Sequence, residues 1–191
     1  MKKIITIMVV CLMVACVISG CARTPGIKIT DSEIANMCLL NKINNQVNYK
    51  YLSESFVEPD LSEQYEKVVV PEEDDEVEKS LLESKIIVEE CKSLDILFTM
   101  DEAKQTVQTE YEQIKQDASE SKYYNIILSV LHESDITESE YLELMESEAF
   151  YKYNKISLKN HFSTKNFDSS KAATLDEQFD EYISKLVSNK G

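Results

Sequence analysis

The chain has 191 residues, and its 35 acidic residues outnumber its 20 lysines and arginines, which gives a formal net charge of −15. This charge excludes the broad basic surface by which proteins bind nucleic acid, and an anionic membrane surface would repel it. Only three glycines and three prolines occur, so the composition favours long helices and argues against a glycine-rich or all-β fold.

The N-terminal residues have the pattern of a bacterial lipoprotein signal. Two lysines precede a fifteen-residue apolar stretch, from Ile4 to Ile18, which is shorter than the roughly 20 residues that span a membrane and suits the apolar region of a signal peptide. The sequence ISGC, which ends at Cys21, resembles a lipobox, in which the cysteine thiol carries the lipid. We therefore expect a lipoprotein signal peptide over residues 1–20, with an ordinary signal peptide or an uncleaved anchor as the alternatives.

Removal of residues 1–20 would leave 171 residues with a formal net charge of −17. With so acidic a body, the lipid on Cys21 would have to provide the membrane attachment. Cys38 and Cys91 would then be the cysteines without a lipid. An extracytoplasmic setting would permit a disulfide between them, but two small, buried apolar side chains are the favoured interpretation. The spacing of cysteine and histidine indicates no metal site, and no cofactor is expected.

Four sequence patterns indicate where helices begin. Each is a capping box, in which a threonine side chain accepts a hydrogen bond from the backbone amide three residues on, and a glutamate at that position returns the bond. An apolar run with helical spacing follows each of them. The boxes are Thr30–Glu33, Thr99–Glu102, Thr137–Glu140 and Thr174–Glu177.

The first expected helix covers residues 31–51, and Pro59 interrupts the segment that follows. A second helix is expected after Pro71, with an acidic first turn that would complement the helix dipole. Its residues 80–94 are apolar on more than one side, which predicts that this is the central helix of the domain. The apolar positions are Leu40, Ile43, Val47 and Tyr51 in the first helix, then Val77, Leu81, Val88 and Cys91 on one face of the second, with Leu82 and Ile86 off that face.

Four more amphipathic helices are expected: one after Thr99, a short one near residues 124–131, one from about Glu138, and one after Thr174. A polar stretch over residues 163–173 reads as a loop before the last helix. The pattern predicts a mainly α fold, a compact bundle of about six helices with few or no short strands. The expected apolar stripes are Met100, Ala103, Val107, Tyr111 and Ile114; Tyr124, Ile127, Leu128 and Leu131; Tyr141, Met145, Ala149 and Ile156; and Leu175, Phe179, Tyr182, Ile183 and Leu186.

The stretches GIKITDSEI, LLESKIIVEECKSLDILFTMDEAKQTVQTEYEQIK and KYYNIILSVLHESDITESEYLELMESEAFYKY resemble the N-terminal chaperone domain of the SurA and PrsA foldases. They match its opening, its apolar helix, its two characteristic turns and its long helix. The resemblance implies a tether over residues 21–30 and a helical chaperone domain of the peptide-binding type over residues 31–160.

The chain departs from that family after the long helix. Family members usually carry parvulin-type prolyl isomerase domains there, followed by a helix that returns to the chaperone domain. Here residues 161–173 stand in place of an isomerase domain, and residues 174–191 are similar to the returning helix. His132 and His161 are isolated, so no parvulin site can be assembled, and we expect no enzyme.

The resemblance implies a lipid-anchored, extracytoplasmic chaperone-like protein that binds unfolded or secreted polypeptides without isomerase activity. The alternative is a structural or adaptor lipoprotein that binds one dedicated envelope partner. Leu144, Phe150 and Tyr151 fall off the stripe of the long helix and are candidates for a peptide groove, although contact with the returning helix would explain them equally well. Met145, together with Met37 and Met100, would give such a groove an adaptable lining.

One basic run stands out in this acidic chain. It contains Lys152, Lys155, Lys159 and Lys165. Compensation of the helix C-terminus is the favoured explanation, and attraction of acidic clients is the alternative.

Overall fold

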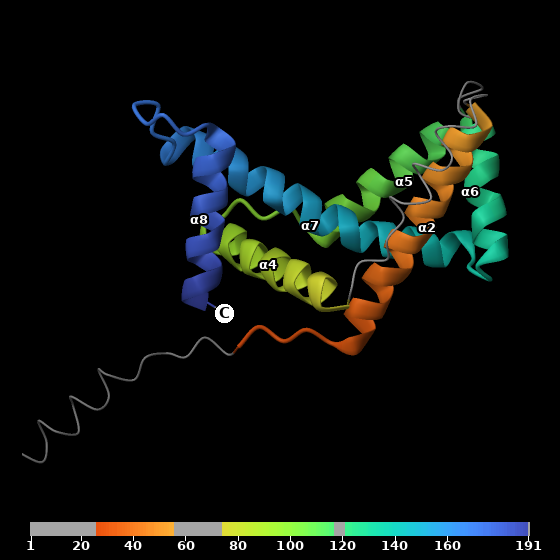
Figure 1. The fold of residues 1–191 in the computed structure, drawn as a ribbon, viewed down its shortest axis with the longest axis horizontal. Helices are drawn as coiled ribbons and strands as arrows, with labels where there is room; N and C mark the ends of the chain where they lie inside the picture. The colour runs from red at the N-terminus through yellow and green to blue at the C-terminus, as the bar shows by residue number, and fades with distance from the viewer. Residues whose placement is uncertain (1–25, 56–73, 117–120, 191) are drawn as a thin grey trace, which may run out of the picture.

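The computed structural model describes residues 26–55, 74–116 and 121–190. No strand occurs in these three ranges, and their six helices confirm the expected mainly α fold (Figure 1). Cys21, the signal peptide, Pro59 and Pro71 lie outside the described residues. The helices are α2 (Asp31–Ser55), α4 (Asp74–Ser93), α5 (Met100–Gln116), α6 (Ser121–Glu133), α7 (Glu138–Lys165) and α8 (Leu175–Lys190).

All four expected capping boxes form at the starts of α2, α5, α7 and α8. In each, the threonine amide donates to the glutamate carboxylate over 2.6–2.9 Å, and the glutamate amide donates to the threonine hydroxyl over 3.2–3.3 Å. These bonds satisfy amides that a helix start leaves without intrahelical partners. The four helix starts are therefore fixed by local sequence.

The ends of α4 and α6 share another local device. Asp95 and Asp135 have φ angles of 58° and 56°, a left-handed conformation that aspartate adopts more readily than most residues. The amides of Ile96 and Ile136, next in the chain, each donate back over 3.0 Å to a carbonyl in the last helical turn. Both isoleucines then pack against a hydrophobic cluster, as expected for this type of helix ending.

The central helix is α7, which packs against each of the other five helices, whereas α4 packs against α2, α7 and α8 (Figure 1). The expectation that residues 80–94 form the central helix is therefore wrong. The prediction that this helix is packed on more than one side is nevertheless confirmed. The helix α4 is buried on several sides, through Val77, Ile86, Ile87 and Cys91. What the sequence pattern could not show is the number of neighbours around α7.

α7 buries different faces along its length, which hides its role in the sequence. Tyr141 and Ala149 pack with residues of α2, α5 and α6, while Leu158 and Phe162 pack with α4 and α8. Nine residues separate Ala149 from Leu158, which is about two and a half turns of helix, so the two side chains lie on opposite sides. A single apolar stripe along the whole helix therefore predicts that Ile156 is buried, but Ile156 is 43% exposed.

The C-terminal helix packs on the body, as the sequence pattern predicts. Phe179 and Ile183 of α8 are buried against Ile87, Cys91 and Leu158. α7 continues to Lys165, so the expected loop over residues 161–173 is wrong for its first five residues. The physical reason is Phe162, whose ring lies 5.7 Å from that of Phe179 and keeps the last turns of α7 in contact with α8.

Two further positions are more exposed than the stripes imply. Tyr51 is 37% exposed and stacks edge-on against Tyr123 of α6, and Met100 is 46% exposed at the start of α5. Among the helices described here, none has an apolar run that could cross a membrane.

Candidate functional site

A pocket of about 220 Å³ lies where the first turns of α2 and α5 meet the middle of α4 and α7. Four helices contribute to it, and its residues come from four separate stretches of the chain. It is bounded by Glu33, Asn36, Met37 and Leu40 of α2, Leu81 of α4, Met100 of α5, and Leu144, Ser147 and Tyr151 of α7.

The inner surface of the pocket is apolar. Leu40 and Leu81 are almost completely buried, and Met37 and Leu144 are half-buried beside them. Met100 is the exposed member among the apolar side chains of the pocket. Methionine has an unbranched, polarizable side chain that adapts to irregular surfaces. The two methionines therefore give a rigid leucine-lined surface two adjustable edges.

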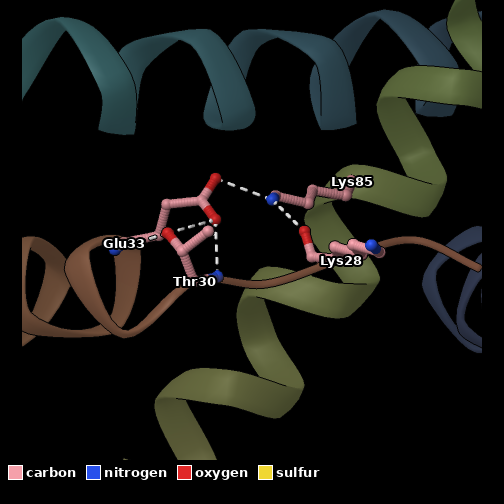
Figure 2. A network of polar contacts seen from close by, with 4 residues as sticks. All are labelled: Lys28, Thr30, Glu33 and Lys85. Carbon is pink, nitrogen blue, oxygen red and sulfur yellow. Dashed lines mark hydrogen bonds and ion pairs between the residues drawn. The ribbon is translucent and has the colours of Figure 1, made fainter.

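Glu33, which lines the pocket, belongs to a polar network with Lys28, Thr30 and Lys85 (Figure 2). The Lys85 ammonium of α4 lies 2.6 Å from Glu33 Oε1 and donates over 2.6 Å to the Lys28 carbonyl oxygen. Glu33 Oε2 accepts from the Thr30 amide over 2.9 Å. Burial opposes ionisation of Glu33, but the bonds from Lys85 and Thr30 outweigh it and lower its carboxyl pKa. The network thereby fastens residues 28–33 to α4 and holds Glu33 in place.

Tyr151 of α7 adds an amphipathic side chain to the pocket lining. Burial, and after it the Glu33 carboxylate, raises the pKa of the Tyr151 phenol, so the hydroxyl stays protonated. Within the described part of the chain this hydroxyl makes no hydrogen bond. A tyrosine at a pocket edge offers its ring to an apolar group and its hydroxyl to a polar one.

The structure divides the four side chains expected to form a peptide groove. Leu144 and Tyr151 line the pocket. Phe150 and Met145 do not: Phe150 packs against the cluster of Ala103, Val107 and Ala149, and Met145 packs against that cluster and its neighbour. Phe150 precedes Tyr151 by one position, and this step rotates its side chain by about 100° around the helix. Phe150 therefore packs toward α5.

The alternative explanation for these residues, contact with the returning helix, finds no support. The partly buried residues around the α8 cluster come from the loop after α4 and from α8 itself, and include none of the four. The sequence patterns did not identify Asn36 and Ser147 as site residues, and they treated Leu40 and Leu81 only as core. Their common place on the pocket depends on how four helices meet, and no local pattern encodes that.

The surroundings of Cys91 are those of a buried structural cysteine. No disulfide joins Cys38 and Cys91; Cys91 is fully buried, and its thiol donates to the Asn154 carbonyl oxygen over 3.3 Å. Burial first, and the Glu90 charge second, raises the pKa of Cys91 to about 11, which keeps it an unreactive thiol.

Two lysines of the basic run join α7 to its neighbours. Lys155 lies 2.9 Å from Glu83 of α4, and Lys159 lies 2.6 Å from Asp176 of α8. Lys152 lies over the ring of Tyr153. These contacts favour a structural explanation of the basic run over attraction of acidic clients.

Nothing in the described ranges groups three or more histidine, cysteine, aspartate or glutamate side chains as a metal would require. The pocket itself holds no nucleophile beside a base. What its walls can do is enclose one apolar side chain and offer hydrogen bonds at the edge.

Comparison with known protein families, curated proteins and solved structures found no match. Function is therefore argued from the pocket and from the sequence patterns.

Proposed function

We propose that this is a lipid-anchored, extracytoplasmic chaperone-like protein that binds unfolded or secreted polypeptides and performs no isomerase reaction. The single observation that carries the proposal is the apolar pocket edged by two methionines and a tyrosine. The resemblance of the sequence to the SurA and PrsA chaperone domain, and the helical body that the resemblance implies, agree with it. Residues 174–191 would be that family's returning helix, present without the isomerase domain.

The pocket suits weak and varied contacts. At about 220 Å³ it is smaller than the roughly 300–1,000 Å³ of most small-molecule sites. It therefore suits one side chain of a longer chain better than a whole small ligand. Methionine-lined surfaces can repack around different partners, as a holding chaperone requires.

The membrane anchor would be the lipid on Cys21. The lipobox supports it, and the acidic body makes electrostatic attachment to anionic lipid unfavourable. Five chain steps separate Cys21 from Gly26, so chain length alone would hold Gly26 within about 18 Å of the lipidated residue. Because Lys85 fastens Lys28 to α4, the whole body would remain close to the membrane surface.

One observation favours the second candidate, an adaptor lipoprotein with one dedicated envelope partner. The pocket is small, about 220 Å³, and a small site suits one recurring side chain better than it suits a broad client surface. An adaptor would bind a folded partner in fixed stoichiometry, whereas a chaperone would bind several unfolded chains with modest affinity.

Aggregation suppression separates these functions. The full chain is reconstituted in neutral phosphatidylcholine vesicles and added to a chemically unfolded protein during dilution from denaturant. We expect light scattering to fall in proportion to the amount of reconstituted protein, with empty vesicles as the control. Unchanged scattering for several unrelated unfolded clients would contradict the chaperone proposal. A stoichiometric complex with one folded envelope protein, with no suppression, would establish the adaptor.

A further inference from the structure

We infer that the pocket binds one aliphatic or methionine side chain of an extended peptide whose neighbouring residues are lysine or arginine. This inference rests on the proposed function, because it names the class of polypeptide segment that the same site would take. Three features carry it: the apolar lining, the polar groups at the edge, and the excess of carboxylates on the surrounding helix turns.

The apolar lining sets the anchor residue. Leu40, Leu81 and Leu144 surround the space, and Met37 and Met100 close its edges. A flexible aliphatic side chain fits such a small, irregular space, and burying one is favourable by the area it removes from water.

The edge offers hydrogen bonds to an extended backbone. The Asn36 and Ser147 side chains are exposed and border the pocket from α2 and α7, and Tyr151 adds its protonated hydroxyl. An extended segment presents unpaired N–H and C=O groups beside each side chain. The three side chains would satisfy such groups without regard to the peptide's sequence.

The charges around the pocket set the preference for cationic neighbours. Glu33 is matched by Lys85, so the excess comes from other residues. Asp101 follows Met100, and Glu143 and Glu146 lie within one turn of Ser147 on α7. None of these three carboxylates makes an ion pair with a described residue. Lys104, one turn past Met100, and Lys152, next to Tyr151, are nearby cations, so the three carboxylates still leave the surroundings negative.

Short-range charge matters most here because salt screens exposed charges beyond about 8–10 Å. The carboxylates on α5 and α7 do not line the pocket, but they are on the turns that carry pocket residues. They would therefore attract the long lysine or arginine side chains that extend from a peptide bound there. The formal net charge of −15 adds a weaker and less specific attraction to any cationic chain.

The test uses three fluorescent peptides that differ only at their centre: Lys-Leu-Lys, Lys-Gly-Lys and Glu-Leu-Glu within a glycine–serine chain. Binding is measured by anisotropy against the full chain in neutral vesicles. We expect Lys-Leu-Lys to bind about tenfold more tightly than Lys-Gly-Lys, since burying a leucine side chain contributes at least that factor. Glu-Leu-Glu should bind more weakly still at low salt, and the difference should shrink as salt is added.

A pair of matched variants assigns the binding to the pocket. Ser147→Phe places a ring at the pocket mouth, whereas Ser184→Phe makes the same change on α8. Both serines are exposed, and each donates to the carbonyl four residues earlier. Ser147→Phe should abolish the preference for Lys-Leu-Lys over Lys-Gly-Lys, and Ser184→Phe should leave it unchanged.

Each outcome has one meaning. Equal binding of Lys-Leu-Lys and Lys-Gly-Lys would reduce the effect to general charge attraction and overturn the inference. If Glu-Leu-Glu binds as tightly as Lys-Leu-Lys, the inferred preference for lysine or arginine neighbours is overturned. If aggregation is suppressed but Ser147→Phe leaves peptide selection intact, the chaperone proposal stands and this assignment of the pocket fails. Selective peptide binding without suppression would instead support this pocket in an adaptor.

Discussion

Asn154 is the most informative single residue of the fold. It is completely buried in α7, and its side-chain amide donates to the carbonyl oxygens of Phe98 and Phe150 over 2.9 and 2.8 Å. Its side-chain oxygen, Oδ1, accepts from the Phe98 backbone amide over 3.0 Å. One side chain thus satisfies both backbone groups of Phe98 and holds the loop between α4 and α5 against α7.

Asn154→Ala should destabilise the protein by about 2 kcal/mol or more, because the buried backbone groups of Phe98 would lose their partners. Urea unfolding followed by circular dichroism measures the change. The matched control is Asn160→Ala, an exposed asparagine on the same helix, for which we expect a change within about 0.5 kcal/mol. Equal midpoints for both variants would show that the Asn154 bonds do not stabilise the fold.

Gln178 repeats the device at the other end of the molecule. Its side chain accepts from the Asp168 amide over 3.2 Å and donates to the carbonyl oxygens of Asp168 and Ala173 over 3.0 and 2.9 Å. The sequence patterns identified neither Asn154 nor Gln178 as a buried side chain. Asparagine and glutamine within a helix are ordinary surface residues, and their burial follows from where a distant loop returns.

At the scale of elements, Glu138 joins three helices. Its Oε2 accepts from the Tyr111 hydroxyl of α5 over 2.9 Å and from the Tyr124 hydroxyl of α6 over 3.2 Å, and Lys115 lies 3.4 Å away. The Tyr111 bond lowers the pKa of the carboxyl, and burial only partly opposes it. The ionised glutamate therefore stabilises the junction of α5, α6 and α7.

This junction predicts a pH dependence. A carboxyl with a lowered folded-state pKa stabilises the protein above its unfolded pKa of about 4.3. That contribution is lost as the pH falls through the folded-state value. Glu138→Gln should thus be less stable than the parent at pH 7, by about 1 kcal/mol or less because Glu138 is partly exposed. The difference should shrink as the pH falls below the unfolded pKa of about 4.3 and vanish once the pH is below the folded-state pKa.

Urea midpoints across this pH range measure the effect. Glu143→Gln changes an exposed glutamate of the same helix and is the matched control. A gap between parent and Glu138→Gln that persists in acid would argue against the ionised glutamate as its cause.

The C-terminal helix gives the largest expected effect of a single element. Phe179 is 2% exposed and lies among Ile87, Leu158 and Phe162, so Phe179→Ala should cost about 3–5 kcal/mol. Phe167→Ala, at a position that is 37% exposed, is the control and should cost far less. Unfolding in urea compares them. Truncation after Ala173 should also lower the midpoint, and an unchanged midpoint would make α8 an independent appendage.

The elements were predictable to the extent that their signals are local. The threonine–glutamate boxes gave four helix starts because both partners lie within one turn. The path of α7 was not predictable, because Ala149 and Leu158 face different neighbours and leave no stripe with a constant direction. For the same reason Phe150 and Met145 of the expected groove do not line the pocket, whereas Leu144, Tyr151, Met37 and Met100 do. Asn36 and Ser147 reach it through tertiary packing.

At the scale of the whole molecule, the expected attachment is tested by Cys21→Ala. If the lipid on Cys21 is the anchor, the variant should leave the membrane fraction, and its circular dichroism and urea midpoint should match those of the parent domain. The acidic body provides no other attraction to anionic lipid. Fractionation in high salt provides the measurement, with Cys38→Ala as the control. Retention of Cys21→Ala in washed membranes would remove the lipoprotein proposal.

The reversal of the buried face along α7 bears on how the molecule opens. Tyr141 and Ala149 depend on α2, α5 and α6, whereas Leu158 and Phe162 depend on α4 and α8. Detachment of α8 would uncover only the second half of this 28-residue helix. Backbone amides after Asn154 would then exchange with solvent through a smaller fluctuation than those before it. One unbroken helix would have two levels of protection, and thermal unfolding would begin at the C-terminal end of the molecule while the pocket is still formed.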